Sequence, residues 1–248
     1  MYNGIADDRC IFKNNQNYNL TTVHIDLSIQ DFKSTYNSGK CVDIELKENG
    51  VKVADADVIM KVYDRNNLIT TYTSSIYNAK VMNLQPGVYD TVCNVRNRGY
   101  ELDPVKITLT IAQAPVEITS PEVTTTYNVN KNVVITVRDA NNNPMEGVDI
   151  SVNLNGIKYL TTNENGQIEL STAKLTPKTY TASITYEGNA LYAKTTAISK
   201  VIIKKATAKI AASNKAFKKK VKTKKYVATL KNNKNAAMKN VRLIMKIK

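Results

Sequence analysis

Residues 148–156 read VDISVNLNG, and this stretch decides the fold class. Apolar and polar side chains alternate from Val148 to Leu154, which is the period of a β-strand with one buried face. Asn155-Gly156 follows directly and favours a tight hairpin, because both central positions of a type I′ turn need a positive φ. The stretch therefore predicts a half-buried strand that enters a hairpin.

The same signals recur along the chain. Residues 133–137 and 180–186 also alternate, and Asn49-Gly50 and Asn165-Gly166 are further expected hairpin turns. No stretch of ten or more residues carries the apolar stripe of an amphipathic helix. We therefore predict an all-β protein.

The sequence also repeats itself. The pattern Leu-x-Pro-x-x-Tyr occurs at 84–89 and again at 175–180, an offset of 91 residues. Thr35-Tyr36 and Thr126-Tyr127 share this offset. Ala216-Phe217 follows Thr126-Tyr127 by 90 residues and Met238 follows Met145 by 93, so a loop in a third copy is about three residues longer. A regular period of this kind indicates repeated structural units.

The repeat boundaries follow from these anchors. We predict whole repeats at 24–113 and 114–205, and the N-terminal part of a truncated Lys-rich repeat at 206–248. Residues 1–23 are interpreted as the C-terminal tail of a preceding repeat, because residues 2–4 resemble residues 186–188. The chain is therefore expected to be a fragment of a longer protein.

Each repeat is expected to form an immunoglobulin-like β-sandwich. About seven short strands in roughly 90 residues fit a fold that usually takes about 100 residues. Tyr89 and Tyr180 each follow a turn-forming Pro, which is the spacing of a tyrosine corner, in which the ring is buried and the hydroxyl bonds to the turn backbone. The fold class is thus predicted as tandem sandwiches of about 90 residues.

The composition excludes several functions. The chain has one His, His24, no Trp and three Cys, so a catalytic triad or a His-rich zinc site cannot be assembled. No apolar run approaches the roughly 20 residues of a membrane-spanning helix, and no signal peptide is recognisable. We predict a protein that is not an enzyme and has no cofactor, metal site or membrane span.

The charge is uneven. Residues 1–187 carry a net charge of −4, whereas residues 188–248 carry +18 and no acidic side chain. This asymmetry suggests contact with a polyanion or an acidic surface. The candidate residues are Lys218, Lys219, Lys220, Lys222, Lys224 and Lys225.

The alternative interpretation of this lysine run is structural. Lysines on a solvated edge strand discourage pairing between chains, and a Lys- and Asn-rich composition also follows from an A/T-rich genome. Nucleic acid is not the expected partner, because only Phe217 and Tyr226 are placed to stack on bases and no base-reading motif is present.

Other candidate sites have structural explanations. Asp55 and Asp57, or Asn163 to Gly166, have the oxygen ligands of a Ca²⁺ site, but the carboxylate that an EF-hand needs is missing, so turn chemistry is expected. Cys93 is expected to point inward and Cys41 outward, which predicts no disulfide. Asn19-Leu20-Thr21 is an N-glycosylation sequon.

These motifs resemble a known family. Residues 148–156, the Leu-x-Pro-x-x-Tyr unit, Tyr186-x-Gly188 and the Lys-rich third copy are similar to the bacterial Ig-like repeats of prokaryotic surface proteins, most of all adhesin-like proteins of methanogenic archaea. The resemblance covers residues 114–248 well and residues 24–113 more weakly. It implies an extracellular location at the cell surface or cell wall, and a role as stalk and display modules in adhesion to another cell. The alternatives are a basic module that binds an anionic wall polymer, and an accessory region of a larger extracellular enzyme.

Overall fold

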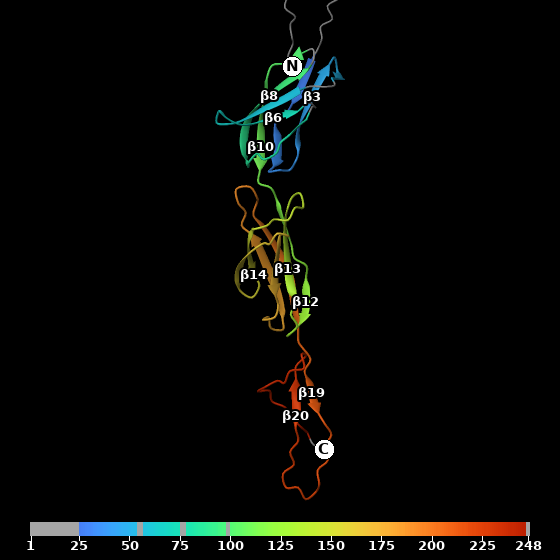
Figure 1. Cartoon of the computed structure of the whole chain (residues 1–248). Helices are drawn as coiled ribbons and strands as arrows, with labels where there is room; N and C mark the ends of the chain where they lie inside the picture. The colour runs from blue at the N-terminus through green and yellow to red at the C-terminus, as the bar shows by residue number, and fades with distance from the viewer. Residues whose placement is uncertain (1–24, 54–56, 75–77, 98–99, 247–248) are drawn as a thin grey trace, which may run out of the picture. The chain divides into compact units, whose positions relative to one another are not determined.

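The structure is a computed structural model that describes residues 25–53, 57–74, 78–97 and 100–246 (Figure 1). The described residues form twenty β-strands and no helix, which confirms the all-β prediction. None of the described residues therefore forms a helix that is long and apolar enough to cross a membrane. The chain divides into two compact units, residues 1–116 with 188–194, and residues 117–187 with 195–248.

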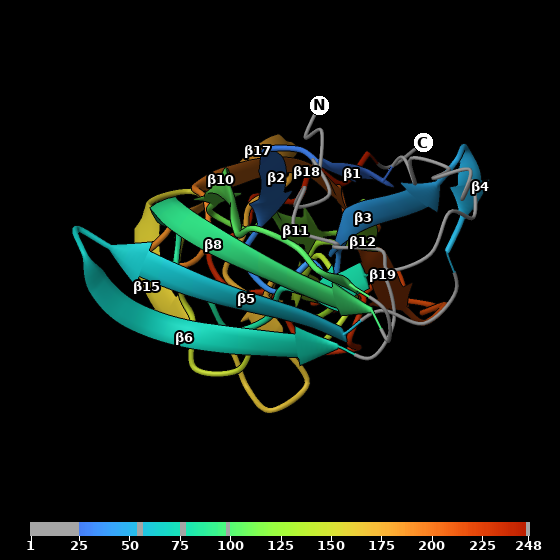
Figure 2. The same cartoon turned by 90° about the horizontal axis from the view of Figure 1, so that it is seen from above.

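The first unit is built from two sheets. One has the order β1-β3-β4, with β7 also paired to β3, and the other has the order β2-β10-β8-β5-β6, with β9 beside β8. Figure 2 shows β8, β5 and β6 side by side, with β3 in a separate layer. The strand bounds are β1 Ile25–Ile29, β2 Phe32–Thr35, β3 Cys41–Glu48, β4 Val51–Lys52, β5 Asp57–Asp64, β6 Asn67–Ser74, β7 Asn78–Lys80, β8 Gly87–Asn97, β9 Tyr100–Glu101 and β10 Val105–Ala112.

The second sandwich repeats this arrangement. Its sheets have the orders β11-β13-β16 and β12-β18-β17-β14-β15. The bounds are β11 Val116–Thr119, β12 Val123–Thr126, β13 Asn132–Asp139, β14 Asp149–Asn153, β15 Ile157–Thr161, β16 Gln167–Ser171, β17 Thr179–Tyr186 and β18 Thr195–Lys204. Each sandwich thus has the same chain order through two facing sheets.

The hydrogen bonds repeat with the sequence. The Val81 N–H donates to the Lys40 carbonyl at 3.2 Å, and Thr172 N–H donates to the Lys131 carbonyl at the same distance. Both pairs are related by the 91-residue offset. Strands β3 and β13 begin and end 91 positions apart as well, so the sequence offset is also a structural offset. The repeat boundaries themselves stay predictions.

The apolar side chains that alternate along the strands form the core of each sandwich. In the first sandwich, side chains from both sheets, such as Ile44 on β3 and Met60 on β5, belong to one buried cluster. In the second, Ile135 on β13 and Ile184 on β17 are fully buried. The burial of alternate residues on both sheets confirms the sandwich, because each strand gives one face to the core and the other to solvent.

Two of the three expected Asn-Gly hairpins are confirmed. Asn49-Gly50 joins β3 to β4 and Asn155-Gly156 joins β14 to β15, and all four residues have positive φ. The prediction for Asn165-Gly166 is wrong. Only Gly166 has a positive φ there, and the turn joins β15 to β16, which belong to different sheets. A turn between sheets does not have to match the strand twist that favours type I′.

The third copy contributes one strand pair. β19 (Lys209–Ala212) pairs antiparallel with β20 (Ala228–Lys231). The Met238 N–H donates to the Leu230 carbonyl at 2.8 Å, and Met145 N–H donates to Val137 at 3.1 Å, the equivalent bond 93 residues earlier. The 93-residue offset therefore also holds in the structure between the end of β20 and Met238.

Candidate functional site

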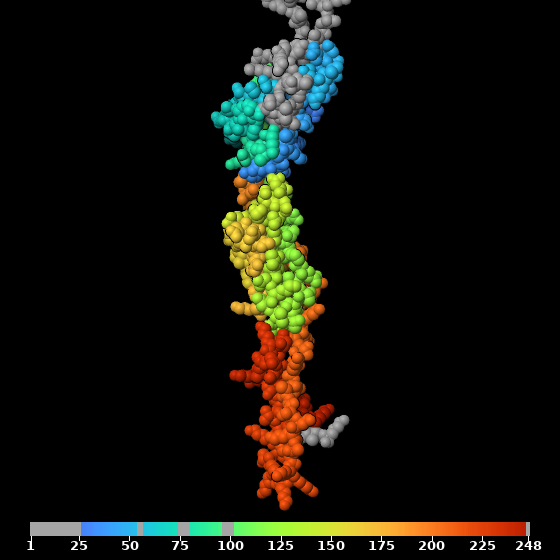
Figure 3. Space-filling model, turned by 45° about the vertical axis from the view of Figure 1, so that its right-hand side comes forward, coloured from blue at the N-terminus to red at the C-terminus, as the bar shows by residue number. Residues whose placement is uncertain are grey.

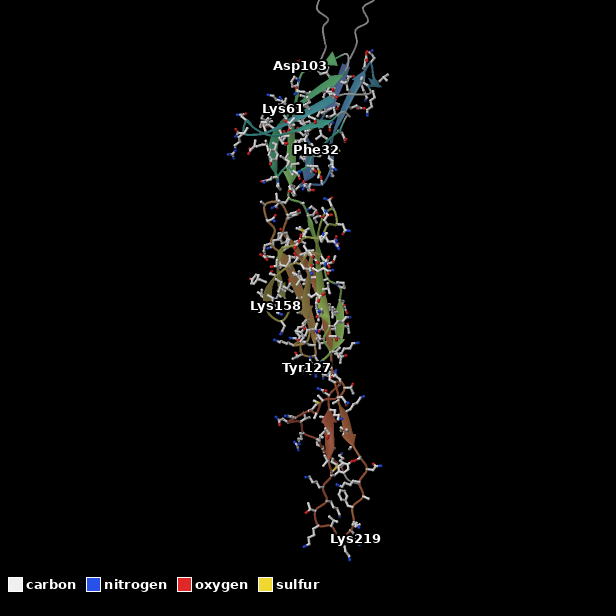
Figure 4. The ribbon with its side chains drawn as sticks, in the orientation of Figure 1. Phe32, Lys61, Asp103, Tyr127, Lys158 and Lys219 are labelled. Atoms are coloured by element: carbon white, nitrogen blue, oxygen red, sulfur yellow. The ribbon has the colours of Figure 1, made fainter. Side chains whose placement is uncertain are left out.

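The lysine run lies in the connection between β19 and β20. All residues from 218 to 225 are exposed, and none belongs to a strand. The Val221 N–H donates to the Lys218 carbonyl at 3.1 Å, which makes a turn within the run. The alternative of a solvated edge strand is therefore wrong, because the run has no ladder to protect. Figure 4 labels Lys219 in this connection, which we call the lysine loop (residues 218–225).

The lysine loop is an enlarged form of a loop that the other copies keep short. Eleven residues separate β1 from β3 and twelve separate β11 from β13, whereas fifteen separate β19 from β20. The third copy is displaced by 90 residues before the loop and by 93 after it, so the three additional residues fall in the loop. Figure 3 shows the side chains of this orange-red part of the chain projecting from the surface.

Contacts at the base of the loop bring its two ends together. The Lys215 ammonium donates to the Lys225 carbonyl at 3.0 Å and lies 5.5 Å from the Phe217 ring centroid. Phe217 and Tyr226 are both about one-third exposed, at 36% and 38%. The loop thus presents six ammonium groups and can attract an anionic surface by Coulomb forces that salt will screen.

Each of the two predicted corner tyrosines forms a hydrogen bond to the turn that precedes it. Tyr89 donates from its hydroxyl to the Gln85 carbonyl at 2.9 Å, and Tyr180 donates to the Thr176 carbonyl at 3.0 Å. The Tyr180 hydroxyl also accepts a hydrogen bond from the Thr176 N–H at 2.9 Å. Burial, and secondarily the charge of Asp64, raises the pKa of Tyr89. These contacts tie each turn to the core and are structural.

The residues at position 87 and at its equivalent, position 178, make different contacts with the ring of the corner tyrosine. A Cβ on Gly87 would approach the Tyr89 ring to 3.1 Å. Lys178 stands at the equivalent place in the second sandwich, and its ammonium lies 4.5 Å from the centroid of the Tyr180 ring. A lysine there stabilises the ring through a cation–π contact.

Cys41 and Cys93 are free, as expected from their directions. Cys93 is completely buried on β8, and Cys41 at the start of β3 is partly exposed. Burial raises the pKa of the Cys93 thiol to about 11, so almost none of it is the reactive thiolate near neutral pH. Cys93 is therefore a core residue and not a nucleophile.

The side chain of Asn163 stabilises its turn by hydrogen bonds to the backbone. The Asn163 side-chain oxygen accepts hydrogen bonds from the N–H groups of Asn165 at 3.0 Å and Gln167 at 2.9 Å. Asp57 lies on a strand, and Asp55 is outside the described residues, as are Asn19, His24 and the tail at 1–23. Across the described ranges, no group of three His, Cys, Asp or Glu side chains is arranged to hold a metal ion.

Three hollows of similar volume are among those on the surface of the described structure. A hollow of about 540 Å³ includes Asp43 and Glu45, and one of about 450 Å³ includes Tyr63 and Asp90. Both include Asp31, which accepts a hydrogen bond from the Thr108 N–H at 2.8 Å and thereby fixes the backbone. The third, of about 410 Å³, lies between the sheets of the second sandwich and includes Lys158 and Lys174. Sequence reasoning missed this third hollow.

Comparison with known proteins adds little beyond the fold. No protein-family pattern matches the sequence, and no curated protein matches it. Fibronectin(III)-like modules of Clostridium thermocellum CbhA share 16% identity, with a TM-score of 0.29 over 72% of this chain and 94% of theirs. Titin domains z1z2 in complex with telethonin share 12% identity, with a TM-score of 0.34 over 75% of this chain and 99% of theirs. Likenesses at this level carry no functional argument.

Proposed function

We propose that this chain is part of a non-catalytic, adhesin-like protein of the cell surface, in which the Ig-like sandwiches at 24–113 and 114–205 act as load-bearing stalk and display modules. The observation that carries the proposal is the way each sandwich closes. Its early strand and its last strand pair in parallel, β2 with β10 and β12 with β18.

Parallel closure has a mechanical consequence. A pull that reaches β12 from its N-terminal side and β18 from its C-terminal side draws these two parallel strands past each other. All the hydrogen bonds between them then carry the load together, whereas bonds that are peeled break one after another. The arrangement suits a module that holds its shape under tension, and it supports the role as a stalk.

Single-molecule force spectroscopy tests this role. Pulled by its ends, the chain should unfold in separate events, each of which releases about 300 Å, from about 90 residues at up to ~3.6 Å each. Tyr127→Pro removes the N–H that donates to the Lys204 carbonyl at 2.8 Å. Because β12 and β18 share only four residue pairs, we expect one of the events to lose about a quarter or more of its force.

Tyr127→Phe is the matched control, since it changes the same side chain and keeps the N–H. The first sandwich, unaltered in both variants, serves as an internal reference. Unfolding without discrete events, or an unchanged force in Tyr127→Pro, would contradict the load-bearing role. Limited proteolysis of intact cells that make the full protein would test its surface location separately.

The lysine loop favours a second candidate function, attachment to an anionic wall polymer. Its lysines are exposed, lie on one enlarged loop and belong to a segment without a carboxylate of its own. Each contact between exposed charges is weak, but several act together on a polyanion. The screening length falls from about 10 Å at 0.1 M salt to about 3 Å at 1 M, so the attraction should fade in that range.

Retention on an immobilised anionic polysaccharide tests this attachment. We expect the unaltered chain to be retained at low salt and released before 1 M salt. Changing all six loop lysines to Gln should abolish most of the retention. The control changes six exposed lysines elsewhere to Gln, namely Lys33, Lys40, Lys61, Lys80, Lys106 and Lys131, for the same loss of net charge. Equal retention of the two variants would show that net charge alone is responsible and that the loop is not a site.

A further inference from the structure

The third hollow is a slot at the side of the second sandwich. It lies between β15, the edge of one sheet, and β16, the edge of the other, and we call it the side slot. Its floor includes the core side chains of Leu154, Leu170 and Leu175, each of which is at least 92% buried. The ammonium-bearing residues Lys158 and Lys174 line it as well, and both are exposed. Figure 4 labels Lys158 on β15.

In the first sandwich, a tyrosine occupies the position that is equivalent to the side slot. Val152 pairs with Ile184 and with Lys158, and Met60 pairs with Cys93 and with Tyr72. Ile184 and Cys93 are equivalent, because each follows its corner tyrosine by four residues. Tyr72 therefore occupies in the first sandwich the position that Lys158 occupies in the second.

Tyr72 closes the gap between its two sheets. Its ring packs against the core cluster, and its hydroxyl donates to the Met82 carbonyl at 2.7 Å. The residue equivalent to Met82 is Ala173, which lines the side slot. The second sandwich thus has a lysine and an alanine where the first has a ring and a methionine, and the gap of about 410 Å³ is left open.

The lining has a defined chemistry. The slot has an apolar floor and two lysines, and no carboxylate is among the residues that line it. Its volume lies within the range of roughly 300–1,000 Å³ that small-molecule sites occupy. A ligand that carries a single anionic group on a short apolar body would satisfy the ammonium groups and cover the floor at the same time.

We infer that the side slot binds a small amphiphilic anion, a carboxylate or phosphate attached to a short alkyl chain, with Lys158 and Lys174 at the anionic group and the leucines along the chain. The inference does not depend on the load-bearing role, since a stalk module can hold tension with or without a bound ligand.

Four eight-carbon probes define the chemistry on the full chain: octanoate, octyl phosphate, octanol and octylammonium. A ligand of this size is expected to bind with roughly millimolar Kd. Octanoate or octyl phosphate should bind at least about tenfold more tightly than octylammonium, and the comparison of the two anions distinguishes a carboxylate source from a phosphate source. Amide shifts in NMR should map to β15, β16 and the segment around Lys174.

Three variants locate the site. Lys158→Tyr, which places the ring of the first sandwich in the slot, should weaken binding of the anions about tenfold or more. Lys200→Tyr adds the same ring at an exposed position of β18 and should leave binding unchanged. The double change Lys158→Gln with Lys174→Gln should weaken octanoate about fivefold or more and leave octanol unaffected.

Several results would overturn the inference. Equal affinity for octanoate and octylammonium would show that the lysines do not select the anion. Unchanged binding in Lys158→Tyr would show that the ligand does not occupy the side slot. Amide shifts confined to the lysine loop would assign the anions to that loop. Thermal unfolding of each variant establishes that lost binding does not come from a lost fold.

Discussion

Replacing Gly166 with alanine is expected to destabilise the second sandwich by about 3 kcal/mol or more. Gly166 has a φ of +68°, where an L-residue costs roughly 1–2 kcal/mol. A Cβ there would also lie 2.5 Å from the Val137 carbonyl oxygen and 2.9 Å from the Met145 nitrogen. Those two atoms are hydrogen-bonded to each other at 3.1 Å, so the methyl group would force the backbone apart.

Calorimetry of the whole chain measures this effect. A loss of about 3 kcal/mol corresponds to a fall of roughly 12–24 °C in Tm for a domain of this size. Gly147→Ala is the matched control, because Gly147 has a φ of +67° and nothing within 4 Å of the position of a Cβ. We expect it to cost only about 1–2 kcal/mol, the strain alone. Equal effects of the two variants would mean that the contact at Val137 is relieved without cost.

Ile184→Ala is expected to cost about 3–4 kcal/mol. Ile184 on β17 is fully buried, and its shortening leaves a cavity that the surrounding strands cannot close completely. The loss should appear in the unfolding of the second sandwich and leave the first unchanged. Hydrogen exchange on peptides from β13 and from β3 assigns the change to one sandwich, which a single unfolding curve of two domains cannot do.

The control is the same substitution on the neighbouring strand. Ile198 on β18 is 76% exposed and pairs with Ser183, the residue just before Ile184. Ile198→Ala should change the unfolding free energy by less than about 0.5 kcal/mol. A comparable loss at both positions would show that β propensity of isoleucine, rather than burial, explains the result at 184.

Much of the fold could be predicted because its signals are local. Alternation at 148–154 predicted which face of β14 is buried, and alternation at 133–137 did the same for β13, whose equivalent at the 91-residue offset is β3. The hairpin between β5 and β6 was missed, since its turn residues are Arg65 and Asn66, both with positive φ, and arginine is not a turn signal. The 163–166 turn was misassigned because Asn-Gly does not tell which strand comes next.

The sites were harder to predict because they depend on pairing between distant strands. The lysine run could be recognised from the sequence. Its position on a loop could not, because that depends on β20 beginning only after the run. The side slot could not be found by comparing the two copies at a constant sequence offset. Met60 and Tyr72 are twelve positions apart, whereas Val152 and Lys158 are six apart, so the shorter hairpin displaces the equivalent residues. Only the strand register places Lys158 opposite the site of Tyr72.

The parallel closure of each sandwich also determines when it can fold during synthesis. Phe32 pairs with Leu109 and Val123 with Val201, so each closing ladder joins residues more than 75 positions apart. Contacts of this range make folding slow, and a ribosome adds only about 5–20 residues per second. A sandwich is therefore complete only when its final strand emerges, about 4–15 seconds after its first. During that delay the strands of one copy cannot pair with the equivalent strands of the copy that follows, because those have not been made. Vectorial synthesis thus delays strand exchange with the following copy until that copy emerges.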